Sequence, residues 1–275
     1  MKTLSVLLRI EWLKAVKRRA FWVAVAAFAA FTALPAVERV RNAQSDQNAV
    51  FALPESWPDI LGSATGMGPL FVGVLMILLF APEFTWRTAR QNVIDGLSKE
   101  RFCAGKLVVL AGLVLLFMAT TVLIGVGGTM LSPGAGGPGF LRSSDLSYMG
   151  GLALGMLVFG SAGMMLSAHL RSSGSALAIL LLYLFVEEAI SRLMLGTGRE
   201  ALRGAAEFLP FNLVEDLGDD LAHYPVVLAE VNADRAERGL VSLAFLDVGV
   251  LVVAALTYSA SFLGRTFLIM RKRDL

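Results

Sequence analysis

Residue types that could support catalysis occur in this 275-residue chain, but their spacing does not form a catalytic group. Ser161 stands in the motif GSAG at 160–163, and the nearest histidine is His169. Eight residues along one helix correspond to about 12 Å, which is beyond the hydrogen-bond reach of a serine–histidine pair. The small residues of this motif, together with Gly151 and Gly155, instead predict close packing between helices.

The chain also lacks the motifs that usually bind metal ions or nucleotides. The chain has two histidines, His169 and His223, and its one cysteine, Cys103, allows no intrachain disulfide. No H-E-x-x-H motif occurs, and the Gly-Lys pair in AGKLV at 104–108 lacks the other residues of a phosphate-binding loop. We therefore expect no catalytic residue, no metal site and no cofactor on this chain.

The polar segment EFTWRTARQNVIDGLSKERFCAGK, residues 83–106, is more informative because it directly follows an apolar run. Its first part predicts a short helix over 84–97, with Phe84 and Trp86 as apolar contact points and Gly96 as a C-terminal stop. Five basic residues would face an anionic membrane surface or an acidic groove: Arg87, Arg90, Lys99, Arg101 and Lys106. An ordinary basic loop would explain the charge but not the helix and the two aromatic side chains.

Composition predicts the fold class that positions this segment. The chain is 56% hydrophobic and 17% charged, whereas soluble domains carry about 25% charged residues. Its mean hydropathy is +0.68, and its charges are clustered between long apolar runs. These features predict an all-α polytopic membrane protein with one transmembrane domain, 1–275. The six predicted spans are about 21–37, 62–82, 107–131, 146–170, 172–190 and 240–264.

The distribution of basic residues predicts how these spans are oriented. With both termini cytoplasmic, the inner segments hold 16 of the 24 basic residues, including all six lysines. Residues 83–106 then form an inner segment, and residues 187–239 form an outer loop with short helices. Three acids near the outer face are candidates for lining an exit, although a solvated acidic rim is the favoured explanation: Glu187, Glu188 and Asp247.

The N-terminal stretch, residues 1–20, predicts a helix that lies on the inner membrane surface before the first span. Leu4, Leu8 and Trp12 form an apolar stripe, and Glu11 falls close to it. A longer first helix with a basic end is the alternative. We expect the first span to be retained, because the stretch before it is long for a signal peptide and TALPA is a poor cleavage site.

On two motifs the chain resembles the membrane subunit of an ATP-binding-cassette exporter of the second type. In that family a cytoplasmic segment joins spans two and three in the pattern Glu…Thr-x-Arg…Leu-Ser-Arg/Lys…Phe…Lys. This pattern is matched by Glu83, Thr88, Arg90, Leu97, Ser98, Lys99, Phe102 and Lys106. The opening EWLKAVKRRAFW is similar to the family's entry helix through Glu11, Lys14, Arg18, Arg19 and Trp22. Arg87 departs from the pattern, because many members have glycine there.

The resemblance implies a non-catalytic permease of the bacterial inner membrane. Two cytoplasmic ATPase subunits would supply ATP and magnesium and would each seat the 84–97 coupling helix. A second permease chain, identical or paralogous, would complete the translocation path, and nucleic acid is not an expected partner. The implied coupling residues are Glu83, Phe84, Trp86, Arg87, Thr88, Arg90, Ser98 and Lys99, and those of the inner-surface entry helix are Glu11, Lys14, Arg18 and Arg19.

Two other classes of protein are alternatives. The first is an ion-coupled secondary transporter, which is disfavoured because the predicted spans have no acidic residue near their centres. The second is a membrane-embedded enzyme, which is disfavoured because no nucleophile–base or metal constellation occurs.

Overall fold

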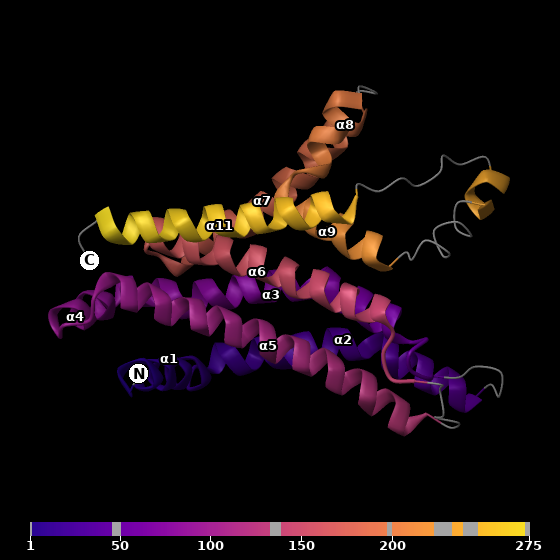
Figure 1. The fold of residues 1–275 in the computed structure, drawn as a ribbon, viewed down its shortest axis with the longest axis horizontal. Coiled ribbons are helices and arrows are strands. Elements are labelled where there is room, and N and C mark those ends of the chain that lie inside the picture. The colour runs from indigo at the N-terminus through magenta and orange to yellow at the C-terminus, as the bar shows by residue number, and fades with distance from the viewer. Residues whose placement is uncertain are drawn as a thin grey trace.

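The computed structural model describes residues 2–45, 51–132, 139–196, 200–222, 233–238 and 247–272. Within these ranges the regular structure is helical, as Figure 1 shows. The elements are α1 (Lys2–Val16), α2 (Arg19–Ser45), α3 (Trp57–Thr85), α4 (Thr88–Ile94), α5 (Lys99–Leu131), α6 (Ser143–Leu170), α7 (Ser173–Gly196), α8 (Glu200–Glu207), α9 (Pro210–Ala222) and α11 (Val248–Lys272). A further helical turn covers residues 233–237.

Five of these helices are long and apolar enough to cross a bilayer: α2, α3, α5, α6 and α11. The chain is thus a polytopic helical membrane protein. The prediction had six spans, and the additional one corresponds to α7, a helix of 24 residues. Its apolar run is short, because Glu187, Glu188 and Arg192 occupy the C-terminal part of the helix.

Helices α3 and α6 form the centre of the bundle, and glycines bring their backbones together. A Cβ atom on Gly163 would lie 2.5 Å from the carbonyl oxygen of Gly73, and one on Gly160 would lie 2.2 Å from Leu110 of α5. Ser161 is fully buried, and its hydroxyl donates to the carbonyl of Val158 at 2.8 Å. The predicted packing role of the small residues in GSAG is therefore confirmed.

The first two helices are separated by a short break rather than fused. Residues 17–18 interrupt the helix, and α2 then continues to Ser45, eight residues beyond the predicted end of the first span. Trp12 packs α1 against α5, because a Cβ atom on Gly112 would lie 2.6 Å from the indole ring. Trp12 also meets Phe21 edge-on, with ring centroids 6.0 Å apart.

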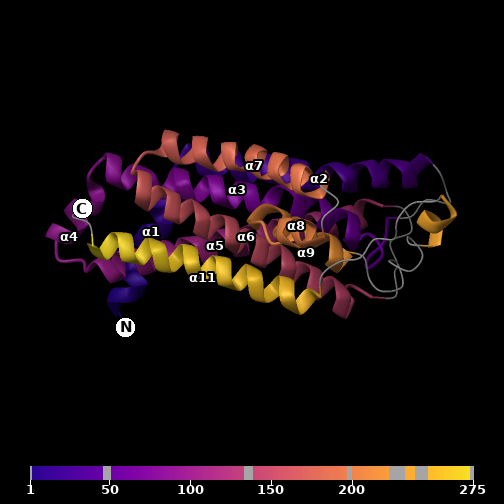
Figure 2. The same ribbon diagram turned by 90° about the horizontal axis from the view of Figure 1, so that it is seen from above.

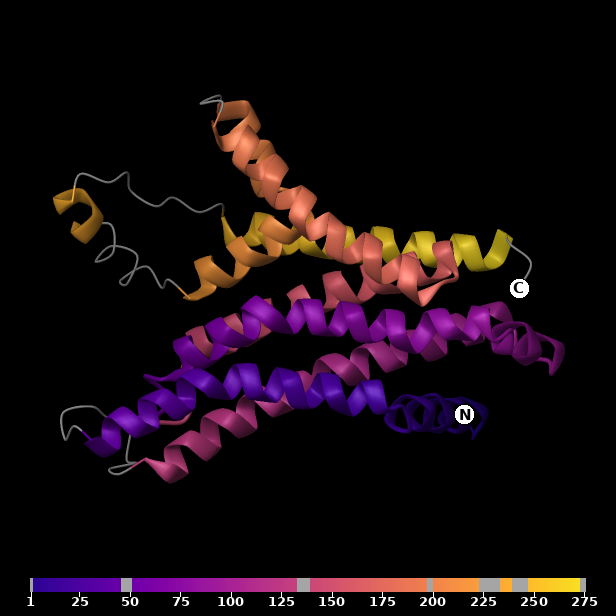
Figure 3. The same cartoon turned by 180° about the vertical axis from the view of Figure 1, so that it is seen from behind.

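The described ends of the chain lie at one end of the bundle, beside α4 (Figure 1). We call this the α4 end. Figures 2 and 3 show α7 leaving this end after α6, and Figure 3 shows it crossing the bundle obliquely to α8. The predicted last span began at residue 240, but residues 239–246 lie outside the described part, and α11 runs from Val248 to Lys272.

Candidate functional site at the α4 end

A buried lysine on α5 lies at the centre of the α4 end. The Nζ atom of Lys106 donates to Oε2 of Glu11 on α1 and to Oε1 of Glu83 on α3. All three residues are 3–4% exposed. We call Lys106, Glu11 and Glu83 the ion cluster. Because charges are costly to bury unless they are paired and hydrogen-bonded, the cluster ties three helices together at one point.

Aromatic and basic neighbours complete the cluster. Lys106 Nζ lies 5.1 Å from the ring centroid of Phe102 and 5.9 Å from that of Phe80. Lys14 Nζ donates to Oε1 of Glu11 at 2.8 Å. Burial raises the pKa of the Glu11 carboxyl, but the charge and hydrogen bond of Lys106, together with those of Lys14, outweigh it and hold the pKa below its ordinary value.

Helix α3 carries Glu83 into the cluster and ends immediately afterwards. The chain then turns at Arg87, whose φ of 57° is left-handed. This is the position where many members of the resembled family have glycine, and glycine adopts this backbone conformation without strain. Thr88 Oγ1 donates to the carbonyl of Glu83 at 3.3 Å, so the turn is fastened to the residue that enters the cluster.

The predicted helix over 84–97 is therefore divided in the structure. Its first two residues belong to α3, and only Thr88–Ile94 form α4. The physical reason is the left-handed turn at Arg87, which no continuous helix contains. Phe84 is partly buried against the hydrophobic core, so its side chain packs inward. The Arg171 guanidinium lies 5.7 Å from the centroid of the Phe84 ring.

The predicted boundaries after α4 are confirmed. Gly96 has a φ of 94°, and its N–H donates to the carbonyl of Val93 at 3.1 Å. The N–H of Leu97 donates to the carbonyl of Asn92 at 3.0 Å, which completes a Schellman motif. Ser98 then caps α5, because its side chain accepts from the N–H of Arg101 at 3.3 Å.

The exposed surface of the α4 end combines apolar and basic side chains. Trp86 is 67% exposed and Ile94 is 66% exposed. Arg90, which lies between these two residues in the sequence, is also exposed. The Arg18 guanidinium lies 5.3 Å from the Trp86 ring centroid. Lys99 donates to the carbonyl of Arg271 at 3.4 Å, which joins the start of α5 to the end of α11. Arg19 is exposed at the start of α2.

The three predicted exit residues do not lie in one group. Glu187 is 1% exposed, and its Oε1 accepts from the N–H groups of Phe211 and Asn212 at 2.6 and 2.9 Å, so it caps α9. Glu188 pairs with Arg192 on the exposed side of α7. Asp247 lies just before α11, where its Oδ1 accepts from the N–H of Gly249 at 2.8 Å. Its carbonyl accepts from the N–H groups of Val250 and Leu251 at 2.8 and 3.1 Å, so Asp247 marks the start of α11.

The ion cluster was not predicted as a group. The position of Glu11 beside the apolar stripe of α1 was the available signal, since a carboxylate there needs a basic partner when the stripe packs. In the part of the chain that the structure describes, no group of three or more His, Cys, Asp or Glu residues is arranged to hold a metal ion.

These features define a polytopic helical membrane protein with a short exposed helix fixed to its core by buried charges. The profile of the ABC-2 family transporter proteins matches residues 7–187, which is more than half of the chain. The chain therefore belongs to the ABC-2 family of transporter membrane proteins. Members are typically non-catalytic membrane subunits, and the family implies a partner ATPase. No curated protein matches the chain in a sequence search.

Proposed function

We propose that this chain is the permease subunit of an ATP-driven exporter. Two separate cytoplasmic ATPase subunits, each binding ATP and magnesium, dock on the α4 end of two permease chains, identical or paralogous. The assembly lies in the bacterial inner membrane with both termini of each permease cytoplasmic. The permease has six spans, with α7 as the fifth, and α1 lies along the inner surface.

The observation that carries this proposal is the exposed surface of the α4 end, which lies next to the buried ion cluster. Trp86, which follows α3, and Ile94, the last residue of α4, offer apolar anchors at the surface of a bundle end, and Arg90 is exposed on α4. Aromatic and arginine side chains supply most of the binding energy at protein interfaces. Lys106 on α5 joins Glu83, near the end of α3 that leads into α4, to Glu11 on α1. A displacement of α4 is therefore passed to three helices at once.

Outward transport follows from how the ATPases act on this end. ATP binding draws the two ATPases together and moves both α4 helices, and the ion clusters transmit this movement into the spans. Access to the path then changes from the inner to the outer face, and hydrolysis resets it. The energy source lies on another chain, which agrees with the absence of acidic residues near the centres of the predicted spans.

Two substitutions on the α4 end test this proposal. Trp86→Ala and Arg90→Glu are expected to lower the amount of ATPase subunit that co-purifies with the permease and to reduce ATP-dependent transport. Leu131→Ala is a matched control, because Leu131 is 70% exposed at the last residue of α5, far from α4. Arg9→Glu is the control for charge reversal, since Arg9 is exposed on α1. Normal co-purification and transport in both α4 variants would contradict the proposal.

A further inference from the structure

One oxygen atom of the ion cluster accepts no hydrogen bond from the part of the chain that the structure describes. Glu83 is 3% exposed, and its Oε1 accepts from Lys106 Nζ, but its Oε2 is buried without a partner among the described residues. A buried carboxylate oxygen that lacks a hydrogen bond is costly, because it has lost its hydration. Native proteins usually satisfy such an atom with another part of the chain or with an ordered water.

A small cavity lies against this carboxylate. Glu83 lines it together with Glu11, Lys106 and Arg18. Its volume is about 10 Å³, close to the space of about 10–15 Å³ that one water molecule needs. Small-molecule sites begin at about 300 Å³. The cavity therefore fits a water molecule and is too small for an organic ligand.

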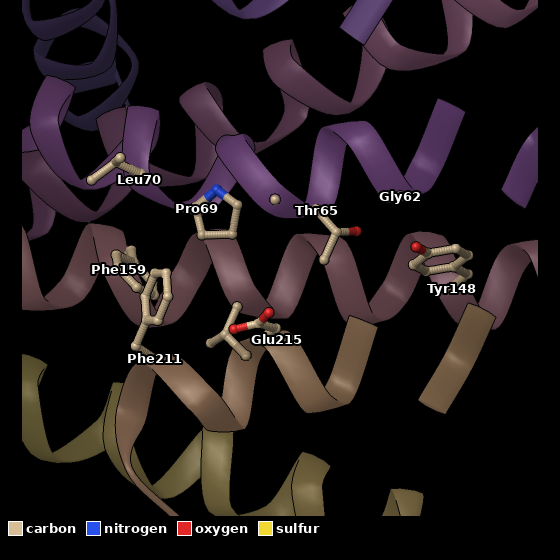
Figure 4. A pocket seen from close by; sticks show the side chains of 10 residues that line it. Gly62, Thr65, Pro69, Leu70, Tyr148, Phe159, Phe211 and Glu215 are labelled. Atoms are coloured by element: carbon tan, nitrogen blue, oxygen red, sulfur yellow. The ribbon is translucent and has the colours of Figure 1, made fainter. Parts of the chain in front are cut away.

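A second carboxylate beside a cavity shows why Glu83 is unusual. A wider cavity of about 310 Å³ lies between α3, α6 and α9, and Figure 4 shows Thr65 and Glu215 on its wall. Glu215 is an exposed residue, so bulk solvent hydrates it. Glu83 is buried, so hydration of its second oxygen depends on the small cavity beside the ion cluster.

Arg18 gives this small cavity a hydrogen-bond donor. Nη1 of Arg18 donates to the carbonyl of Leu78, and a guanidinium has further N–H groups besides this one. Burial lowers the pKa of the Arg18 guanidinium, whereas the charges of Glu83 and Glu11 raise it, so the guanidinium is within electrostatic reach of both carboxylates. A water in the cavity thus has at least two polar partners, as a buried water requires.

We propose that one water molecule is bound in this cavity between the Arg18 guanidinium and Oε2 of Glu83. The water donates to Oε2 and accepts from the guanidinium, so it adds Arg18 to the ion cluster without a direct ion pair. Its binding requires neither ATPase nor ATP. The Arg18 guanidinium also lies 5.3 Å from the Trp86 ring centroid. The water therefore connects the ion cluster to the surface on which the ATPase docks, and only this connection rests on the proposed export function.

A buried methionine reports on water in this cavity. Met76 lines the cavity and is fully buried, so radicals formed in bulk solvent do not reach it. X-ray radiolysis of a bound water forms a hydroxyl radical at the site, and methionine is readily oxidised to its sulfoxide. Met164 on α6 is the matched control, because it is also fully buried but does not line the cavity.

The experiment is X-ray footprinting of the full chain in lipid nanodiscs without ATPase, read by mass spectrometry. We expect Met76 to be oxidised several-fold faster than Met164. A radical scavenger in the solvent should protect the exposed Trp86 and leave Met76 unprotected. These two comparisons use the wild-type chain and do not depend on the folding of any variant.

Two variants then test the cavity and its donor. Ala15→Val narrows the cavity, since Ala15 lines it, whereas Ala24→Val makes the same change at a buried alanine elsewhere. Arg18→Leu leaves the water without its donor, and the control Arg9→Leu removes an exposed arginine that does not line the cavity. We expect oxidation of Met76 to fall several-fold in Ala15→Val and in Arg18→Leu and to stay unchanged in the two controls.

Three results would overturn the proposal. They are equal oxidation of Met76 and Met164, protection of Met76 by the scavenger as strong as that of Trp86, and unchanged oxidation of Met76 in a folded Ala15→Val or Arg18→Leu variant. If neither variant folds, the wild-type comparisons decide. Because the assay contains no ATPase, its failure leaves the exporter proposal standing, and loss of the exporter proposal leaves this water site standing.

Discussion

Replacing the buried lysine of the ion cluster is expected to be strongly destabilising. Lys106→Met keeps a side chain of similar length but leaves the carboxylates of Glu11 and Glu83 buried without their shared cation. Removing one partner of a buried ion pair costs about 3–5 kcal/mol, because the remaining charge is uncompensated. We expect a loss in this range in the free energy of unfolding, with part of the Glu11 charge still balanced by Lys14.

The charge explanation predicts a rescue. In the triple variant Glu11→Gln/Glu83→Gln/Lys106→Met no charged group of the ion cluster remains. Replacing every member of a buried ion pair or triad by neutral residues of similar volume often leaves the stability unchanged. We expect this variant to recover most of the stability and to stay within about 1–2 kcal/mol of the wild type, since the buried amides retain polar groups with fewer partners.

The assay is unfolding of the purified chain in mixed micelles by titration with sodium dodecyl sulfate, followed by circular dichroism. Lys99→Met is the control, because Lys99 is only partly buried and its hydrogen bond to the carbonyl of Arg271 is long, at 3.4 Å. Its expected cost is within about 1 kcal/mol. The reasoning is refuted if Lys106→Met costs no more than this control, or if the triple variant is as unstable as the single one.

Three further predictions concern the turn, the helix cap and acid sensitivity. Arg87→Gly is expected to raise the free energy of unfolding by up to about 1 kcal/mol, because a left-handed non-glycine residue is strained, whereas Arg90→Gly inside α4 is expected to lower it by about 1 kcal/mol. The same detergent titration measures both, and a loss of stability in Arg87→Gly would contradict the turn. Ser98→Ala is expected to cost about 1 kcal/mol and Ser98→Asp much less, since only the latter keeps a cap for α5; equal losses would exclude the cap. The pKa of Glu11 is lowered in the folded chain, so its stabilising contribution is present above pH 4.5, the ordinary carboxyl value, and is lost as the pH falls through the lowered pKa. Glu11→Gln should therefore flatten the fall in stability below pH 4.5, and an unchanged acid profile would show that another group is responsible.

Local signals in the sequence predicted much of the α4 end. Gly96 and Ser98 marked the end of one helix and the start of the next, because each has a backbone or side-chain role that few residues share. The division of the predicted 84–97 helix was not predicted. Arginine at position 87 does not favour a left-handed backbone, and the available signal was the glycine that many members of the resembled family have there. The ion cluster joins residues from α1, α3 and α5, and contacts between distant segments are not encoded in local spacing.

The predicted exit residues Glu187 and Glu188 also differ in whether their contacts are local or join distant segments of the chain. The pairing of Glu188 with Arg192 is a local contact, because the two residues are one helical turn apart on α7. The capping of α9 by Glu187 depends on how α7 and α9 meet, so the sequence predicted only a residue near an outer rim. The close approach of α9 to α3 at Gly218 and Thr65 likewise has no signature in the sequence.

Photo-crosslinking from position 86 shows whether an ATPase binds the α4 end. A photoreactive p-benzoylphenylalanine replaces Trp86 in cells, and the crosslinked partner is identified by mass spectrometry, with position 131 as the control. We expect a covalent product with a cytoplasmic ATPase from position 86 and none from position 131. A product from neither position, or labelling of position 86 by a membrane-impermeant reagent added outside intact cells, would contradict it.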